Sequence, residues 1–116
     1  MNLPQLLAAL CKLSPVSVEV CERDGTPGGM LFDFANGKTL SVQWHRYSYS
    51  NVAYWETGDA LEFECAAWDT ASMVDGTFGS RRWFMPEGFG RGDDVLRVEC
   101  EELAAFAYAV SEDCGF

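Results

Sequence analysis

The 116-residue sequence is poor in basic residues, and this shortage argues against a whole class of functions. Eight Lys and Arg stand against 18 Asp and Glu, which gives a formal net charge of −10. Direct binding of nucleic acid is not expected, because proteins grip the phosphate backbone with basic patches. An acidic surface suits a basic partner, such as a protein that itself binds nucleic acid, or it serves only solubility.

The sequence also lacks the cysteine and histidine spacings that are typical of metal sites and redox motifs. The five cysteines are an odd number, and no two of them form a CxxC pair. With His45 as the only histidine, the sequence predicts no metal site, no disulfide framework and no cofactor. Reduced thiols are the expected state of Cys11, Cys21, Cys65, Cys100 and Cys114.

Long apolar runs are also absent. No stretch approaches the roughly 20 residues that a membrane helix requires, and the residues after Met1 lack the pattern of a signal peptide. A soluble, cytoplasmic protein is expected. The hydrophobic fraction of 48% supports a packed core, and the length indicates a single domain over residues 1–116.

The clearest local pattern lies in residues 61–69, where apolar and acidic side chains alternate. A period of two predicts a half-buried β-strand with one apolar face and one charged face. The apolar set contains Leu61, Phe63 and Cys65, and the charged set contains Glu62 and Glu64. We expect this strand to pair centrally in a sheet.

The N-terminal half predicts a helix followed by strands. Leucines at helical spacing indicate a helix over 2–13, which Ser14-Pro15 ends. Alternating patterns predict strands that begin at Val16, at Met30 and at Thr39. Residues 23–29 have turn chemistry, and Asn36-Gly37 is a strong hairpin signal between the second and third strands.

The C-terminal half predicts a loop over 69–79, a short strand at 81–84 and an irregular segment at 85–92. A short extended piece at 94–98 and a helix at about 99–112 follow. The helix is indicated by apolar residues at spacings of three and four, and by acidic residues where a helix N-terminus favours negative charge. The apolar stripe contains Leu103, Phe106, Ala107 and Val110.

Together these patterns predict an α+β fold: an antiparallel sheet of four to five strands, over about 16–84, with the N-terminal and C-terminal helices packed on one face. The other face is expected to be open and partly acidic. The inward set is Val16, Val18, Val20, Phe32, Phe34, Leu40, Val42, Trp44, Leu61 and Phe63. The outward set is Ser17, Glu19, Asp33, Ser41, Gln43, Glu62 and Glu64.

Two groups of side chains are candidates for partner binding. The carboxylates fall on the outer face of the predicted sheet and around the start of the last helix, where their spacing can resemble nucleic-acid phosphates, as in a DNA mimic. They are Glu19, Asp33, Glu62, Glu64, Asp93, Asp94, Glu99, Glu101 and Glu102. Residues 44–55 hold five aromatics, a type enriched in binding hot spots. Tyr47, Tyr49 and Trp55 are the candidate contacts there, although Trp44, Tyr54 and Trp55 could instead cap the core.

No catalytic or phosphate-binding motif is present. A cysteine acting with His45 could form a nucleophile and its base, but the sequence brings no cysteine to His45. The residue pattern therefore predicts no enzyme, with a small Cys/His hydrolase kept as an alternative. The arginines at 81, 82, 91 and 97 are expected to pair with local acids.

Three short motifs carry a resemblance over residues 30–112. Val42-Gln43-Trp44, then Ala66-Ala67-Trp68-Asp69, then the helix from Glu101 to Phe106 resemble a loose group of small phage- and prophage-encoded proteins. Residues 45–55 and 80–92 depart from that pattern. Small acidic phage proteins are similar in character to anti-CRISPR inhibitors. The resemblance implies a non-enzymatic inhibitor that binds a CRISPR effector complex through its acidic surface and blocks nucleic-acid access. A phage structural or assembly protein with incidental acidity is the alternative.

Overall fold

The computed structural model describes residues 3–23, 25–44, 62–73, 82–89 and 96–113. Within them the chain forms two α-helices, a short 3₁₀ helix and six strands of one sheet. The elements in chain order are α1 (Leu3–Cys11), β1 (Ser17–Arg23), β2 (Thr26–Asp33), β3 (Lys38–Gln43), β4 (Glu62–Asp69), η1 (Thr70–Met73), β5 (Trp83–Phe84), β6 (Leu96–Glu99) and α3 (Cys100–Ser111).

The sheet is antiparallel throughout, and β4 pairs with three other strands. Strands β1, β2, β3 and β4 lie in sequence order, and both β5 and β6 pair with the far edge of β4. Strand β6 pairs with the first half of β4, from Glu62 to Cys65, and β5 pairs with Ala67 and Trp68. The predicted extended piece at 94–98 is thus a strand of the sheet. The predicted α+β fold with an antiparallel sheet and two helices is confirmed.

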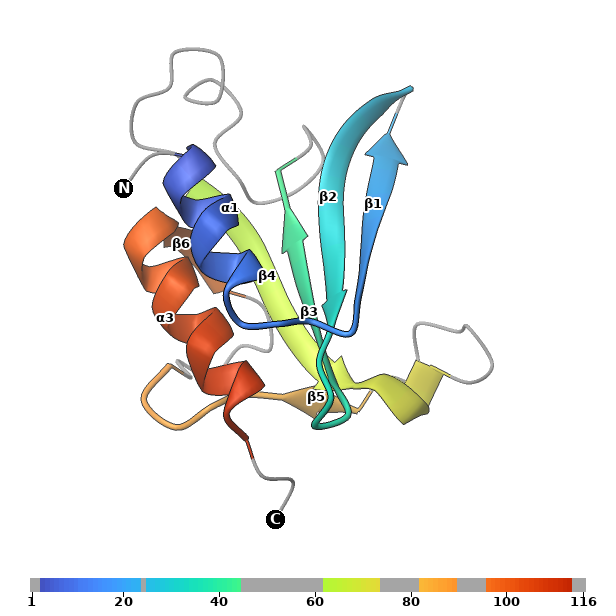
Figure 1. Ribbon diagram of the computed structural model, residues 1–116, viewed down its shortest axis with the longest axis vertical. Coiled ribbons are helices and arrows are strands. Elements are labelled where there is room, and N and C mark those ends of the chain that lie inside the picture. The colour runs from blue at the N-terminus through green and yellow to red at the C-terminus, as the bar shows by residue number, and fades with distance from the viewer. Residues whose placement is uncertain (1–2, 24, 45–61, 74–81, 90–95, 114–116) are drawn as a thin grey trace.

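Both helices cover the same face of the sheet (Figure 1). Helix α1 contributes Leu6 and Leu10, and α3 contributes the predicted stripe, whose members are all buried. The sheet side of the core contains Phe32, Leu40, Val42, Phe63, Cys65, Ala67 and Val98. Trp44 packs against this core, with its ring edge-on to Phe63 at 6.2 Å between centroids. The alternation in β4 was therefore a correct guide to its buried face.

Glycines with positive φ form the turns of both hairpins, and one of the two turns is shorter than predicted. Gly37, at φ +83°, closes the predicted β2–β3 hairpin. The β1–β2 hairpin is tighter than predicted, because Arg23 pairs with Thr26 and Gly25 takes φ +78°. Most of the predicted turn at 23–29 is therefore strand. Gly29 belongs there because the side chain of Gln43, its cross-strand neighbour, occupies the place of a Cβ atom.

The helices leave β1 uncovered, and here the predicted inward set is wrong. Val16, Val18 and Val20 are 66%, 45% and 53% exposed. Val18 and Val20 pair with Phe32 and Met30, so they do face the helical side of the sheet. Two helices, each about 10 Å wide, cover only about four strands at a spacing of about 4.8 Å. Strand β1 lies beyond that width, as Figure 1 shows.

Candidate protein-binding surface

Carboxylates gather where β6 runs into α3. Glu99 ends β6 in extended conformation, at φ −82° and ψ 173°, and its side chain makes no capping hydrogen bond. Glu101 and Glu102 lie in the first turn of α3, and all three side chains are exposed. The partial positive charge of a helix N-terminus favours acids at this position. We call Glu99, Glu101 and Glu102 the acidic end of α3.

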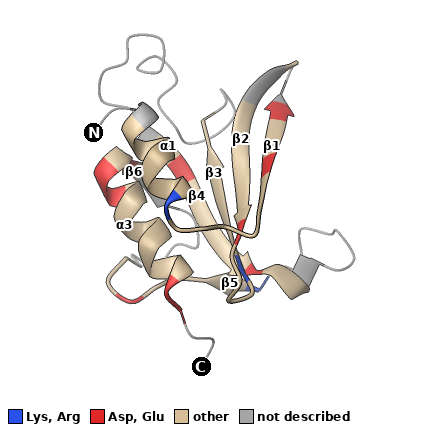
Figure 2. Cartoon of the chain, in the orientation of Figure 1, with Lys and Arg blue, Asp and Glu red and all other residues tan. Residues whose placement is uncertain are grey.

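Strand β4 brings two further glutamates beside the acidic end. Glu62 is the cross-strand partner of Glu99, and half-buried Glu64 is the partner of Arg97. Figure 2 shows acidic positions on the first turn of α3 and on the neighbouring part of β4. Two segments separated by more than thirty residues in the sequence, 62–64 and 99–102, therefore lie side by side.

The outer face of the sheet is not the open acidic surface that the sequence predicts. Its centre is buried, with Thr39 at 3% and Trp68 at 5% exposure, and these two residues are cross-strand partners. Ser41 and Ala66, the next outward pair, are also buried. Trp68 packs edge-on against Trp83 at 5.8 Å between ring centroids. Acids on this face are separated by a packed centre.

Asp33, a predicted contact residue, holds the fold locally. Its two carboxylate oxygens accept hydrogen bonds from the hydroxyls of Ser17, at 2.8 Å, and Thr39, at 2.7 Å. The Thr39 hydroxyl also lies 2.7 Å from that of Thr70 in η1. The bonds link β1, β2, β3 and η1 at one end of the sheet. Asp33 is thus engaged by its own chain.

The remaining predicted contacts divide into two groups. Glu19 is exposed on β1, away from the acidic end. Tyr47, Tyr49, Trp55, Asp93 and Asp94 lie outside the described residues. The structure therefore brings together Glu62, Glu64, Glu99, Glu101 and Glu102 and leaves Glu19 and Asp33 apart from them.

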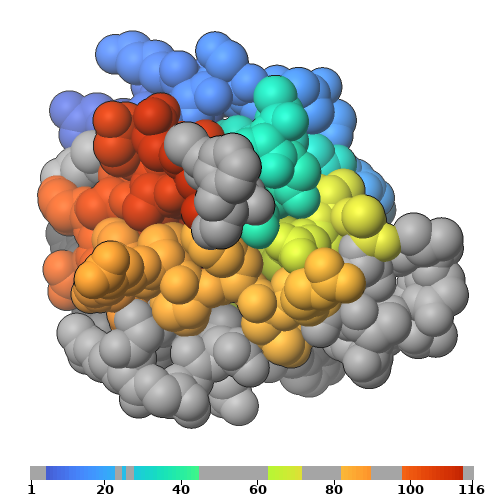
Figure 3. Space-filling view, turned by 90° about the horizontal axis from the view of Figure 1, so that it is seen from below, coloured from blue at the N-terminus to red at the C-terminus, as the bar shows by residue number. Residues whose placement is uncertain are grey.

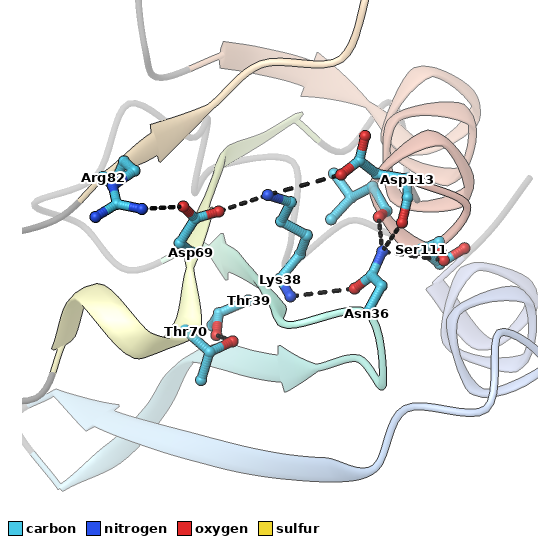
Figure 4. Close-up of polar contacts among 9 residues, drawn as sticks. Asn36, Lys38, Thr39, Asp69, Thr70, Arg82, Ser111 and Asp113 are labelled. Carbon is cyan, nitrogen blue, oxygen red and sulfur yellow. Dashed lines mark hydrogen bonds and ion pairs between the residues drawn. The ribbon is translucent and has the colours of Figure 1, made fainter. Parts of the chain in front are cut away.

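A polar cluster that the sequence analysis missed lies at the opposite end of α3. The Asn36 amide donates to the carbonyl oxygens of Val110 at 2.7 Å, Asp113 at 2.9 Å and Ser111 at 3.2 Å. These oxygens belong to the end of the helix, where carbonyls lack partners within the helix. Asn36 also accepts from the Lys38 backbone N–H. Figure 4 shows these contacts.

Lys38 is the centre of this cluster. Its ammonium lies 2.5 Å from Asp69 Oδ1, 3.6 Å from Asp113 Oδ2 and 4.6 Å from the ring centre of Phe84. The side chains of Lys38 and Asp69 are only 13% and 23% exposed. We call Asn36, Lys38, Asp69 and Asp113 the locked end of α3. Seen from below in Figure 3, the end of α3, the β2–β3 turn, residues 82–89 and the end of β4 meet there.

The charges at the locked end stabilise each other. The Lys38 hydrogen bond, with the charges of Lys38 and Arg82, holds the pKa of Asp69 below its usual value, although burial opposes the shift. The exposed Arg82 lies 3.2 Å from Asp69 Oδ2. The expected pairing of arginines with local acids is confirmed at Arg82. The locked end connects the C-terminal end of α3 to β3 and β4 and, through the Lys38–Phe84 contact, to β5.

The buried cysteines do not have the properties of nucleophiles. Burial, with the charges of Glu102 and Glu64, raises the pKa of Cys65 to about 12. Burial and nearby Glu101 also raise the pKa of Cys100. A catalytic cysteine needs a lowered pKa, so both thiols behave as small hydrophobic groups. His45 lies outside the described residues.

Among the residues that the structure describes, no group of three or more His, Cys, Asp and Glu side chains is arranged to hold a metal ion. No helix in the described ranges is long and apolar enough to cross a membrane. No protein-family model, curated protein or solved structure matches this chain.

Proposed function

We propose that this protein is a non-enzymatic inhibitor of phage type, active in the host cytoplasm. It docks its acidic surface on a basic nucleic-acid channel of a defence complex, such as a CRISPR effector, and blocks access of the nucleic acid. The observation that carries the proposal is the acidic end of α3, where three exposed glutamates lie beside Glu62 and Glu64 of β4. The net charge of −10 adds long-range attraction to a basic channel.

The acidic end suits binding because its glutamates are exposed and rigidly placed. Glu99 is fixed by the β4–β6 pairing, and Glu101 and Glu102 are fixed by the first turn of α3. The helix behind them is anchored in the core by Leu103 and Phe106, both fully buried. The ordered backbone lowers the entropy lost on binding, because only the side chains remain to be ordered.

The test is binding of a purified CRISPR effector at increasing salt. Contact between an acidic surface and a basic channel should weaken steeply as salt screens the charges. The variant Glu99→Gln/Glu101→Gln/Glu102→Gln should bind at least about tenfold more weakly, which corresponds to about 1.4 kcal/mol. Binding that does not change with salt would contradict the mechanism.

A matched control separates location from total charge. Glu22, Glu87 and Glu112 are exposed glutamates outside the acidic end. The variant Glu22→Gln/Glu87→Gln/Glu112→Gln removes the same charge, so it reduces long-range attraction equally while leaving the acidic end intact. It should bind nearly as well as the wild-type protein. Equal losses in both triple variants would mean that net charge alone drives binding.

A phage structural or assembly protein is the second candidate, and one observation favours it. The exposed valines of β1 form an apolar edge, as expected of a protein that associates with copies of itself. This function predicts incorporation into virions, which mass spectrometry of purified particles detects. The Cys/His hydrolase is disfavoured by the raised pKa of Cys65 and Cys100. If the protein's biological activity is lost in the His45→Ala variant, the hydrolase becomes a candidate function again.

A further inference from the structure

Strand β1 presents apolar side chains at an open edge of the sheet. It is the first strand in the order β1–β2–β3–β4–β5, and the described residues place no strand on its other side. Val16, Val18 and Val20 are all more than 40% exposed. We call these three residues the valine edge. An edge strand carries backbone N–H and C=O groups that can pair with another strand.

The valine edge lacks the features that usually protect an edge strand. Lysines, prolines and bulges commonly prevent edge-to-edge pairing. In β1 the bulge lies between Cys21 and Glu22, beyond the last valine. Residues 16–20 contain neither lysine nor proline, and Pro15 lies before the strand begins. Residues 17–20 therefore form a regular strand on which another strand can pair, and Val16 directly precedes it with its backbone N–H bonded to the Asp33 carbonyl oxygen.

We propose that β1 pairs antiparallel with β1 of a second copy, about a two-fold axis at Val18. The segment Val16-Ser17-Val18-Glu19-Val20 is complementary to itself in this register. Val18 lies opposite Val18 of the second copy, and Val16 opposite Val20. On the outer face, Ser17 lies opposite Glu19. Apolar residues thus meet apolar residues, and no two carboxylates lie directly opposite.

The neighbouring registers are worse. An axis at Ser17 leaves Val20 opposite Ser14 and Glu19 opposite Pro15 of the second copy. An axis at Glu19 places the two Glu19 carboxylates directly opposite each other, which is destabilising. An axis at Val20 places Val18 opposite Glu22 of the second copy. The Val18 register therefore specifies one symmetric, closed dimer, because a two-fold contact uses the same surface on both copies. It joins the two sheets into one continuous sheet.

Charge and size set the strength of this dimer. Each copy carries a net charge of −10, so the copies repel at low salt and associate more readily as salt is added. This is the opposite of the salt dependence expected for a basic partner, so the two proposals stand or fall separately. A contact limited to one edge strand is smaller than about 1,200 Å², typical of weak, reversible association.

Sedimentation velocity under reducing conditions, from dilute to concentrated samples, tests the proposal. The wild-type protein should form dimers at high concentration, and added salt should strengthen them. Val18→Lys should weaken dimerisation at least about tenfold, because it places two lysines opposite each other. Tyr108→Lys is the matched control, since Tyr108 is 58% exposed on α3; it should dimerise as the wild-type protein does.

Two further variants keep the test decisive. Val18→Thr retains a β-branched shape and should also weaken the dimer, even if Val18→Lys impairs folding. Glu19→Gln should strengthen it, because Glu19 lies diagonally across from its own copy in the proposed register. A wild-type protein that stays monomeric at every concentration would overturn the proposal. Equal dimerisation of Val18→Thr and Tyr108→Lys, or a dimer weakened by salt, would do the same.

Discussion

The two ends of α3 use charge in opposite ways. At the locked end, Lys38 and Asp69 are largely buried, and Lys38 contacts two carboxylates and an aromatic ring. At the acidic end, Glu101 and Glu102 are exposed, and Glu99 makes no capping hydrogen bond. A half-buried charge requires a partner, whereas interactions of exposed charges add little to stability. We therefore expect the locked end to contribute more to stability than the acidic end, to which the proposed function assigns binding.

Removal of Lys38 should have the largest effect on stability. Lys38→Met keeps the length of the apolar stem but leaves Asp69 and Asp113 without their shared cation. We expect a loss of about 2 kcal/mol of unfolding free energy, because Asp113 and partly buried Asp69 both lose Lys38, although Asp69 keeps the exposed Arg82 as a cationic partner. Urea denaturation measures it. Lys12→Met, at an exposed lysine, is the control and should change stability little; equal losses in the two variants would contradict the role of Lys38.

Loss of the Asn36 amide should have the next largest effect. Asn36→Ala removes the donor to the carbonyl oxygens of Val110, Ser111 and Asp113. We expect a loss of about 1 kcal/mol, typical of a part-buried hydrogen-bonding group. Hydrogen exchange should show faster opening of the last turn of α3, while the first turn exchanges as before. Uniform acceleration along α3 would mean that Asn36 acts on the whole fold.

Low pH should weaken the locked end through Asp69. Its pKa is lowered in the folded protein, so its stabilising contribution is complete above the usual carboxyl pKa of about 4. The contribution is lost as pH falls through the lowered value. The difference in unfolding free energy between wild-type protein and Asp69→Asn should therefore shrink on acidification. In the Lys38→Met background this pH dependence should largely disappear, because Lys38 is the main cause of the shift.

Neutralising the acidic end should have the smallest effect on stability. The Glu99→Gln/Glu101→Gln/Glu102→Gln variant loses part of the favourable interaction between its carboxylates and the helix N-terminus, which is small at exposed positions. It also removes mutual repulsion between the carboxylates, so the two effects should largely cancel and the net change should be smaller than that of Asn36→Ala. Thermal unfolding measures this change. A much larger loss would mean that these glutamates are structural.

The architecture could be predicted because each element carries its own periodicity. Alternation in residues 61–69 and the stripe from Leu103 to Val110 correctly identified the buried faces of β4 and α3. The pattern could not show how far the helical layer extends, so the valines of β1 were predicted to be buried. Alternation defines two faces of a strand, but the width of the covering helices decides which strands are buried.

The surface proposed to bind a partner, at the acidic end of α3, could be predicted from the sequence only in part. Acidic residues before and within the last helix were visible in the sequence, because helix N-termini favour them. Their proximity to β4 depends on the β4–β6 pairing, which no local pattern specifies. The locked end depends on longer separations still: Asn36 and Val110 are 74 residues apart. Asn36-Gly37 was recognised as a turn, but its second role requires the packed helix.

The proposed division of α3 into a binding end and a folding end is tested by measuring two quantities on the same variants. Affinity for a CRISPR effector and unfolding free energy are measured for the triple glutamine variant and for Lys38→Met. The triple variant should lose at least about tenfold in affinity and keep its stability, whereas Lys38→Met should lose stability and keep its affinity. Wild-type affinity in the triple variant would contradict the account.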